Sequence, residues 1–470
     1  MSWQIENFLE EKNGVLHIDG VDAVELAKQY GTPLFVFSES RVRHNIDRIK
    51  KAAAVIDRPL KLCYAAKAMS TMGILRAVKD AGSDIEVNSG GELWKALQVG
   101  FTGDQINFNG NSKEVWELEL AIENEIYAIQ VDSLYELSLI EETAKKAGKR
   151  ANVSLRLVPE IKTGTHSGLQ TALLTSKFGM MPDEAFDAFR KYKDSPHLNL
   201  TGIHLHIGSQ LPEPEAYADA FRMLFDSLMR IDAEAGIRLG HVNLGGGFPV
   251  NYLRGALQTS EFPAEQRDMF AADFEPADAV GSAWNAVKDF ARDCGAEHLL
   301  DGLTLLLEPG RSIIADTAVC LTTIRNTKTR PRHTPDGSNP ETDRWLLTDA
   351  GFNILLSMET YKWYYHLISA QRAGHPHDTR YKLAGPLCDG GDVYFDHEGA
   401  GRLPEHRLLP ADARPGEILA LLNCGAYSLA QAMQYNGRFL PPVVLIRANN
   451  KAELIRQRDE FRDLVNNDIY

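Results

Sequence analysis

The chain has 470 residues, of which 44% are hydrophobic and 24% are charged, and its formal net charge is −14. This length predicts more than one domain, because domains hold roughly 100–200 residues, although a β/α barrel takes about 250. The negative charge argues against nucleic acid and anionic membranes as partners. No basic and apolar leader opens the chain, and no apolar run approaches the ~20 residues of a membrane span, so we expect no membrane segment.

The cysteines are scattered and form no CxxC pair. They are Cys63, Cys294, Cys320, Cys388 and Cys424. An odd, dispersed set is typical of the reducing cytoplasm and argues against a zinc site or a disulfide scaffold. We therefore expect a cytoplasmic protein without a structural metal.

The first ~37 residues predict a short helix followed by strands at 14–18 and 33–37. From about 38 to 315, apolar runs alternate with amphipathic stretches such as 134–147 and 216–235. The predicted strands are residues 61–66, 84–88, 106–109, 128–131, 153–158, 202–207, 241–244 and 303–307. Eight strands with intervening helices favour a (β/α)8 barrel, and strand counting leaves a doubly wound open sheet as the alternative.

Two stretches interrupt this repeat, at residues 159–180 and 251–275, and both are predicted as insertions. Beyond 316 the repeat stops. Strands are predicted at 319–324, 345–348, 417–422 and 443–446, with a polar loop at 328–343. The predicted domains are an N-terminal segment (1–37) that joins the β domain, a barrel (38–315) and a mainly β C-terminal domain (316–470).

Lys67 lies in Tyr64-Ala65-Ala66-Lys67-Ala68, where a predicted strand gives way to a helix. A lysine that is forced into an apolar setting has a lowered pKa and can act as a nucleophilic amine. Taken alone, this motif more often marks a strand-end lysine that points into water.

Two glycine-containing segments follow the last two predicted barrel strands, where barrels often bind phosphate. Gly245, Gly246 and Gly247 allow backbone N–H groups to converge on an anion. In Glu308-Pro309-Gly310-Arg311, an arginine beside a glycine is suited to contact phosphate. Three glycines alone also fit a flexible turn, but the two segments together predict a phosphate site.

His204 and His206 alternate along the sixth predicted strand and are expected to point into the barrel. The alternatives are core histidines, which suit His204, or a metal pair, for which no third ligand is evident. His206 lies nearer the strand end and is placed to face a ligand ring. Lys67, the phosphate site and a ring partner together suggest pyridoxal 5′-phosphate. Glu308 against the pyridine nitrogen would keep the ring protonated and stabilise a carbanion, the alternative being a buried ion pair.

Cys388 sits in a turn of small residues beside Asp389, and this setting favours a reactive thiol over an inert one. Cys424, in a predicted strand, fits the inert alternative. Tyr427 closes another strand and could reach a phosphate, or could be a packed aromatic residue.

From about Gly31 onward the chain resembles the alanine-racemase-fold (fold-type III) pyridoxal-phosphate decarboxylases of diaminopimelate, ornithine and arginine. The shared motifs, in the family's order, are YAAKA, NSGGEL, NGNSKE, GIHLHIGSQ, LGGGFP, EPGRS, GPLCDGGD and GAY. The resemblance implies that Lys67 holds the cofactor, that His206 stacks on its ring, and that Glu308 binds the ring nitrogen with Glu86 nearby. The implied phosphate ligands are Ser209, Gly245, Gly246, Gly247, Gly310, Arg311 and Tyr427.

The resemblance also implies a head-to-tail homodimer with shared active sites. Cys388 of one subunit would protonate the carbanion in its partner's site, and Asp389 would bind the distal amine of the substrate. Arg311 and Asp349 are assigned to substrate binding as well.

Departures from the family pattern bear on the substrate. Diaminopimelate enzymes usually carry a longer acid at the place of Asp389, and an arginine that binds the distal carboxylate at the place of Ser357. These differences favour the D-lysine/D-ornithine decarboxylase branch, which makes a polyamine-type diamine and CO2. The segments 162–166 and 176–179 instead resemble the corresponding segments of the meso-diaminopimelate decarboxylases, which make L-lysine. A siderophore-pathway decarboxylase is a further alternative.

The sequence gives less support to two other functions, namely amino-acid racemisation and a non-catalytic regulatory role. Racemases of this fold place an arginine at the pyridine nitrogen, so Glu308 argues against racemisation. Non-catalytic relatives of ornithine decarboxylase tend to lose cofactor residues, and here all of them are in place.

Overall fold

The computed structural model describes residues 3–158, 177–254, 262–332 and 342–469. The chain divides into two compact units. The first unit is Met1–Val42, Val250–Ala271 and Ile314–Tyr470, and the second is Arg43–Pro249 and Ala272–Ile313. The predicted domain borders near residues 37 and 315 stay a prediction, and the segment Val250–Ala271 groups with the first unit.

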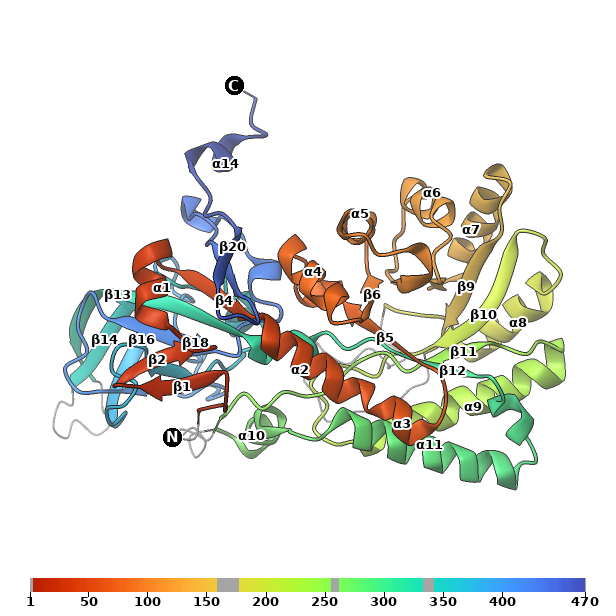
Figure 1. Cartoon of the computed structure of the whole chain (residues 1–470), viewed down its shortest axis with the longest axis horizontal. Coiled ribbons are helices and arrows are strands. Elements are labelled where there is room, and N and C mark those ends of the chain that lie inside the picture. The colour runs from red at the N-terminus through yellow and green to blue at the C-terminus, as the bar shows by residue number, and fades with distance from the viewer. Residues whose placement is uncertain (1–2, 159–176, 255–261, 333–341, 470) are drawn as a thin grey trace. The chain divides into compact units, whose positions relative to one another are not determined.

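The second unit holds a closed barrel of eight parallel strands (Figure 1). In chain order the strands are β5 (Leu60–Ala65), β6 (Asp84–Val87), β7 (Ile106–Phe108), β8 (Ala128–Val131), β9 (Ala151–Arg156), β10 (Leu198–His204), β11 (His241–Asn243) and β12 (Thr304–Leu307). They correspond one to one to the eight predicted strands. The predicted barrel is therefore confirmed, and the open-sheet alternative is wrong because β12 pairs with β5 and closes the ring.

Helices connect the barrel strands. They are α4 (Met72–Asp80), α5 (Gly90–Val99), α6 (Val115–Glu123), α7 (Leu134–Lys146), α8 (Pro182–Tyr192), α9 (Glu215–Ala235) and α11 (Pro276–Asp293). Serines start two of them, because the side chain of Ser89 accepts from Glu92 N and that of Ser133 from Glu136 N, each at 3.2 Å. These two capped turns fix the chain directly after β6 and β8, at the strand ends where a barrel carries its functional residues.

The first unit is mainly β, as predicted. A nine-stranded sheet contains the order β17-β16-β14-β13-β4-β19-β20, with β18 pairing β13 and β15. Its strands are β4 (Leu34–Ser38), β13 (Ala318–Pro331), β14 (Thr342–Thr348), β15 (Leu367–Ser369), β16 (Thr379–Ala384), β17 (Arg407–Leu409), β18 (Ile418–Leu422), β19 (Val443–Ile446) and β20 (Ala452–Arg456). A separate three-stranded sheet holds β1 (Leu9–Lys12), β2 (Val15–Ile18) and β3 (Val21–Asp22).

Three sequence predictions are corrected. The predicted N-terminal helix is wrong, because Leu9–Lys12 forms β1 and pairs with β2. The predicted loop at 328–343 is shorter, because β13 runs to Pro331 and β14 begins at Thr342. The predicted insertion at 251–275 contains α10 (Ala264–Ala271). Most of the insertion predicted at 159–180 lies outside the described residues. Among the helices that are described, none has the length and apolarity that crossing a membrane requires.

Candidate active site

Lys67 lies on a single 3-10 turn, Ala66–Ala68, that directly follows β5. This is the predicted junction between strand and helix, since α4 begins at Met72. Its Nζ is 4.0 Å from Glu86 Oε1, and its side chain is 41% exposed. The predicted apolar setting of Lys67 is therefore only partial, because much of its side chain reaches solvent.

The register of the barrel brings polar side chains beside this turn. Glu86 is paired with Ala65 on one side and with Asn107 on the other, so the three residues are lateral neighbours near the strand ends. Glu86 is fully buried, and its Oε1 accepts a hydrogen bond from Asn109 Nδ2 at 2.7 Å. The neighbourhood of Lys67 is therefore acidic and held in place by an amide.

Glu308 follows β12 and is buried. Its carboxylate accepts hydrogen bonds from three asparagine side chains, namely Asn107, Asn243 at 2.7 Å and Asn109 at 2.9 Å. Sequence reasoning missed the roles of these asparagines. The available signal was that amides occupy positions in or just after short, otherwise apolar barrel strands.

Burial, and after it the nearby Glu86 carboxylate, raise the pKa of Glu308 to about 7. Hydrogen bonds from Asn243 and Asn109, together with the charge of Lys67, act in the opposite direction. The acid is thus poised between its neutral and ionised forms near neutral pH, and a cationic partner would ionise it.

The two histidines are placed differently. β10 ends at His204, which is fully buried with Nε2 3.4 Å from Glu308 Oε2. His206 lies beyond the strand end, and its Nδ1 accepts a hydrogen bond from Gly246 N at 3.2 Å. Burial holds the pKa of both rings well below the ordinary value, with Arg156 acting further on His204 and Lys67 on His206. Both rings are therefore neutral, which suits His206 for stacking on another ring.

The glycine loop has no room for side chains. A Cβ on Gly245 would collide with His206, one on Gly246 would collide with the carbonyl of Glu308, and Gly247 adopts a positive φ of 102°. The buried Tyr217 hydroxyl donates to Gly246 O at 3.0 Å, a support that sequence reasoning missed. The loop is therefore fixed in a shape that leaves its backbone close to Glu308 and His206.

Arg311 and Ser209 are brought together, as the phosphate prediction requires. Arg311 opens the short helix α12 (Arg311–Ile314), and its Nε donates to Ser209 Oγ at 3.1 Å. A Cβ on Gly310 would lie 3.0 Å from Ala68 Cβ, so this glycine allows the chain to pass close to the Lys67 turn.

The other predicted site residues lie in the first unit. Cys388 is exposed, and its backbone N–H donates to Asn436 Oδ1 at 2.7 Å. Asp389 accepts from Gly391 N at 2.9 Å and from the Tyr435 hydroxyl at 3.3 Å. Tyr427 follows β18 with a positive φ of 54°. Cys424 is buried, as predicted, and burial raises the pKa of its thiol.

Asp349 has both carboxylate oxygens engaged within the first unit. Oδ1 accepts from Thr322 Oγ1 at 2.7 Å and from Thr323 N at 3.0 Å. Oδ2 accepts from Arg325 Nη2 at 2.6 Å and from Thr32 Oγ1 at 2.7 Å. The predicted substrate contact of Asp349 gains no support from this geometry, which is that of a structural carboxylate.

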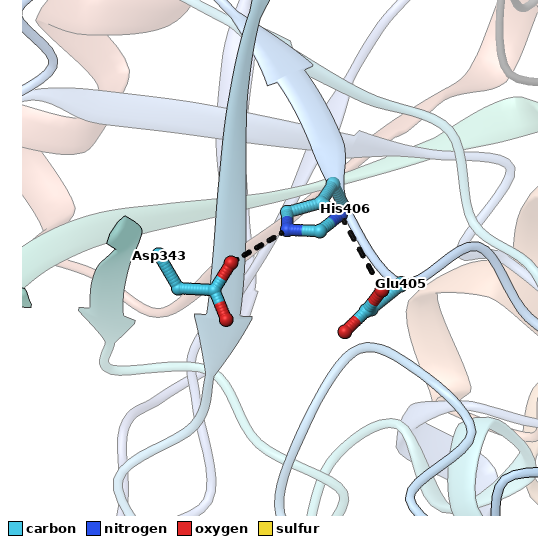
Figure 2. A group of neighbouring side chains, drawn as sticks. All are labelled: Asp343, Glu405 and His406. Carbon is cyan, nitrogen blue, oxygen red and sulfur yellow. Dashed lines mark hydrogen bonds and ion pairs between the residues drawn. The ribbon is translucent and has the colours of Figure 1, made fainter. Parts of the chain in front are cut away.

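A separate group, Asp343, Glu405 and His406, has the spacing of a possible cation site in the first unit (Figure 2). Its place is already taken by a protein cation, because Lys382 Nζ lies 2.9 Å from Asp343 Oδ2 and 2.7 Å from Glu405 Oε1. The group is therefore an internal ion-pair cluster.

Comparisons with known proteins agree with this geometry. The family described as "Pyridoxal-dependent decarboxylase, pyridoxal binding domain" matches residues 39–315. Diaminopimelate decarboxylase of Methanocaldococcus jannaschii is 32% identical over 467 residues, covering 98% of this chain and 96% of the relative. The enzyme of the same name from Bacillus subtilis is 30% identical over 463 residues, with coverages of 98% and 96%.

Solved structures that are similar to this chain also include diaminopimelate decarboxylases. The crystal structure of diaminopimelate decarboxylase from M. jannaschii has a TM-score of 0.82 and 32% identity, and the match covers 98% of each chain. That of the Helicobacter pylori enzyme complexed with L-lysine has a TM-score of 0.79 and 27% identity, with coverages of 94% and 98%. The family match spans more than half of the sequence and the whole barrel, and this chain therefore belongs to the pyridoxal-dependent decarboxylases, enzymes that use pyridoxal 5′-phosphate.

Proposed function

We propose that this enzyme decarboxylates meso-diaminopimelate to L-lysine. The observation that carries the proposal is the similarity, over 98% of the chain, to relatives named diaminopimelate decarboxylase. This was the alternative to the D-lysine/D-ornithine interpretation of the sequence, and the comparisons favour the alternative.

The residues at the barrel end fit the cofactor. The loop Gly245–Gly247 and the Arg311–Ser209 pair suit a phosphate, because glycines without a Cβ let an anion come close to the backbone and Arg311 supplies a guanidinium. The Glu308 carboxylate, held by three amides, suits a protonated pyridine nitrogen. Pyridoxal 5′-phosphate, when bound, supplies the electron sink that stabilises negative charge at the substrate α-carbon.

Each residue then has a defined task. Lys67 holds the cofactor through its amine, and Glu308 in its ionised form keeps the ring nitrogen protonated. Neutral His206 packs on the ring, with Glu86 nearby. The phosphate ligands in the barrel are Ser209, Gly245, Gly246, Gly247, Gly310 and Arg311, and the role of Tyr427 stays a prediction of the family resemblance.

We further propose that the enzyme works as a cytoplasmic homodimer with shared active sites. Cys388 and Asp389 of one subunit would enter the site of the other, with Cys388 delivering a proton and Asp389 binding the distal amine. The exposed position of Cys388, on a loop anchored by Asn436, supports its availability to a second chain.

We expect Cys388→Ala to slow product formation by about 10²-fold, as loss of a general acid does, and to lower the stereochemical purity of the product made in D2O. Cys424→Ala is the matched control, because that thiol is buried and is expected to leave both measurements unchanged. Normal rate and purity in Cys388→Ala would remove the proton-donor role.

Shared sites are tested by mixing two inactive variants, Lys67→Ala and Cys388→Ala. Random reassociation of a symmetric dimer would restore about a quarter of the wild-type sites, because each mixed dimer holds one intact site. No recovery after confirmed subunit exchange would contradict the sharing of sites.

Ser357 supports a second class of substrate, diamino acids without a distal carboxylate. This residue stands where diaminopimelate enzymes usually carry an arginine, and its Oγ is within hydrogen-bonding distance of Tyr427 O at 3.2 Å and Gln431 Oε1 at 3.3 Å. A hydroxyl committed to the protein cannot bind a distal carboxylate as a guanidinium fork does. D-Lysine and D-ornithine lack that carboxylate, so they are the second candidates.

The deciding experiment measures CO2 release by the cofactor-loaded enzyme from meso-diaminopimelate and from both enantiomers of lysine, ornithine and arginine. Preference for meso-diaminopimelate is the expected result. Preference for D-lysine or D-ornithine would replace it with the second candidate. No release from any of them would point to a conjugated substrate, as in siderophore assembly.

A further inference from the structure

Asn243 lies between Glu308 and the glycine loop. Its Nδ2 donates to Glu308 Oε1 at 2.7 Å, while its Oδ1 accepts from Gly245 N at 2.8 Å. An amide side chain has one donor end and one acceptor end. Rotation of this fully buried amide by 180° would place its oxygen against the carboxylate, so the two bonds fix one orientation.

A backbone hydrogen bond also links Glu308 to the glycine loop. Glu308 N donates to Gly245 O at 2.7 Å, so Gly245 is bonded to Asn243 through its N–H and to Glu308 through its carbonyl. A Cβ on Gly246 would also collide with the carbonyl of Glu308. The acid and the loop are therefore in direct contact, and the side chain of Asn243 bonds to both.

We infer that Asn243 is a positioning residue that holds Glu308 and the glycine loop as one element, so that the ring nitrogen and the phosphate of the cofactor are bound cooperatively. This inference rests on the proposed binding of the ring nitrogen by Glu308 and of the phosphate by the loop. Cooperative binding follows because any shift of the loop also shifts the amide donor of Glu308.

Asn107 provides a matched comparison. It is also fully buried and also donates to Glu308, but its Oδ1 accepts from Gln130 Nε2 at 2.9 Å rather than from the loop. Removing either asparagine takes one donor away from the same carboxylate. Only the change at Asn243 also removes a side-chain hydrogen bond to the glycine loop.

Other charged or titratable groups act on the same carboxylate and are common to both variants. They are Glu86, Lys67, His204, Arg156 and Cys63. Since amide donors favour the ionised form of a carboxylate, each variant raises the pKa of Glu308. A difference between the variants therefore reports on the loop and not on the acid.

The test compares the affinity for pyridoxal 5′-phosphate with that for pyridoxal, which lacks the phosphate, in wild type, Asn243→Leu and Asn107→Leu. Binding is followed by cofactor absorbance, and folding is checked by circular dichroism. We expect the phosphate's contribution, the ratio of the two affinities, to fall about fivefold in Asn243→Leu, as expected for loss of the neutral hydrogen bond between Asn243 Oδ1 and Gly245 N, which only this variant removes. In Asn107→Leu the ratio stays within about twofold of wild type.

An unchanged ratio in Asn243→Leu, or an equal fall in both variants, would overturn the inference, because a merely structural role weakens both ligands alike. Asn243→Ala carries the same expectation if the leucine variant does not fold. Failure of the proposed cofactor site gives a different result, because the wild-type protein itself would then show no preference for the phosphorylated ligand, and the choice of substrate is tested separately by CO2 release.

Discussion

Replacing Lys67 with alanine is expected to reduce decarboxylation by at least about 10³-fold, because the amine that we propose holds the cofactor is lost. Lys67 lies on the turn after β5, with Nζ 4.0 Å from Glu86 Oε1, and its side chain is 41% exposed, so its replacement leaves no large cavity in the core. The variant should therefore fold normally. CO2 release measures the activity, and the absorbance of the bound cofactor reports on its covalent attachment.

Lys146→Ala is the matched control. That lysine pairs with Glu142 on the exposed face of α7 with a side chain 70% exposed, and its loss is expected to leave activity unchanged. Retention of full activity and of the covalent absorbance band in Lys67→Ala would show that another amine holds the cofactor, and the assignment of the whole barrel-end site would have to be revised.

The barrel was predictable because its strands are short apolar runs separated by amphipathic helices. Each of the eight strands lies within a few residues of its predicted position, since both faces of a barrel strand are buried and its sequence shows this directly. In the first unit, β15 and β17 were missed because each has only three residues. β16 was missed because Arg380 and Lys382 interrupt its apolar character.

The candidate site was predictable where a residue type carries its own chemistry. Lys67, Glu308, Arg311 and the glycines stand out in the sequence, and the structure brings them to one end of the barrel. The asparagines that hold Glu308 do not stand out, because an amide in a strand has many possible partners. Their role depends on lateral pairing such as Glu86 with Asn107, a register that becomes visible only once the strands are aligned.

The environment of Glu308 also could not be read from the sequence. Its carboxylate was expected to be ionised by a cofactor ring, but its state before the cofactor binds depends on burial and on Glu86. Two buried carboxylates that share the amide of Asn109 repel each other. The cofactor-free enzyme therefore contains an acid whose ionisation opposes folding.

This opposition predicts a pH dependence of stability. The pKa of Glu308 is raised from 4.5 to about 7 in the folded chain, so between these values the folded state holds a proton that the unfolded state has released. The contribution of Glu308 to the free energy of unfolding therefore falls as pH rises from about 4.5 to about 7, by up to about 3 kcal/mol.

In Glu308→Gln the side chain does not titrate, so the pH-dependent contribution of residue 308 to the free energy of unfolding is absent. We expect the free energy of unfolding of the cofactor-free variant, measured with urea, to gain on that of wild type as pH rises across this window. Glu10→Gln is the control. Glu10 is on the surface and pairs with Lys12, whose hydrogen bond holds the pKa of Glu10 below its ordinary value, so this variant should not gain on wild type as pH rises. A constant difference between wild type and Glu308→Gln from pH 4.5 to 7 would contradict the prediction.

The same substitution should reduce decarboxylation when the cofactor is bound. A neutral amide cannot hold the ring nitrogen protonated, so the electron sink weakens and we expect a fall of about 10²–10³-fold in kcat, as for loss of one preorganised electrostatic contact. The pH-dependent part of the stability and the activity would thus change in opposite directions in one variant. This is the behaviour of a charge that the fold retains at the expense of its own stability because the ring nitrogen requires it.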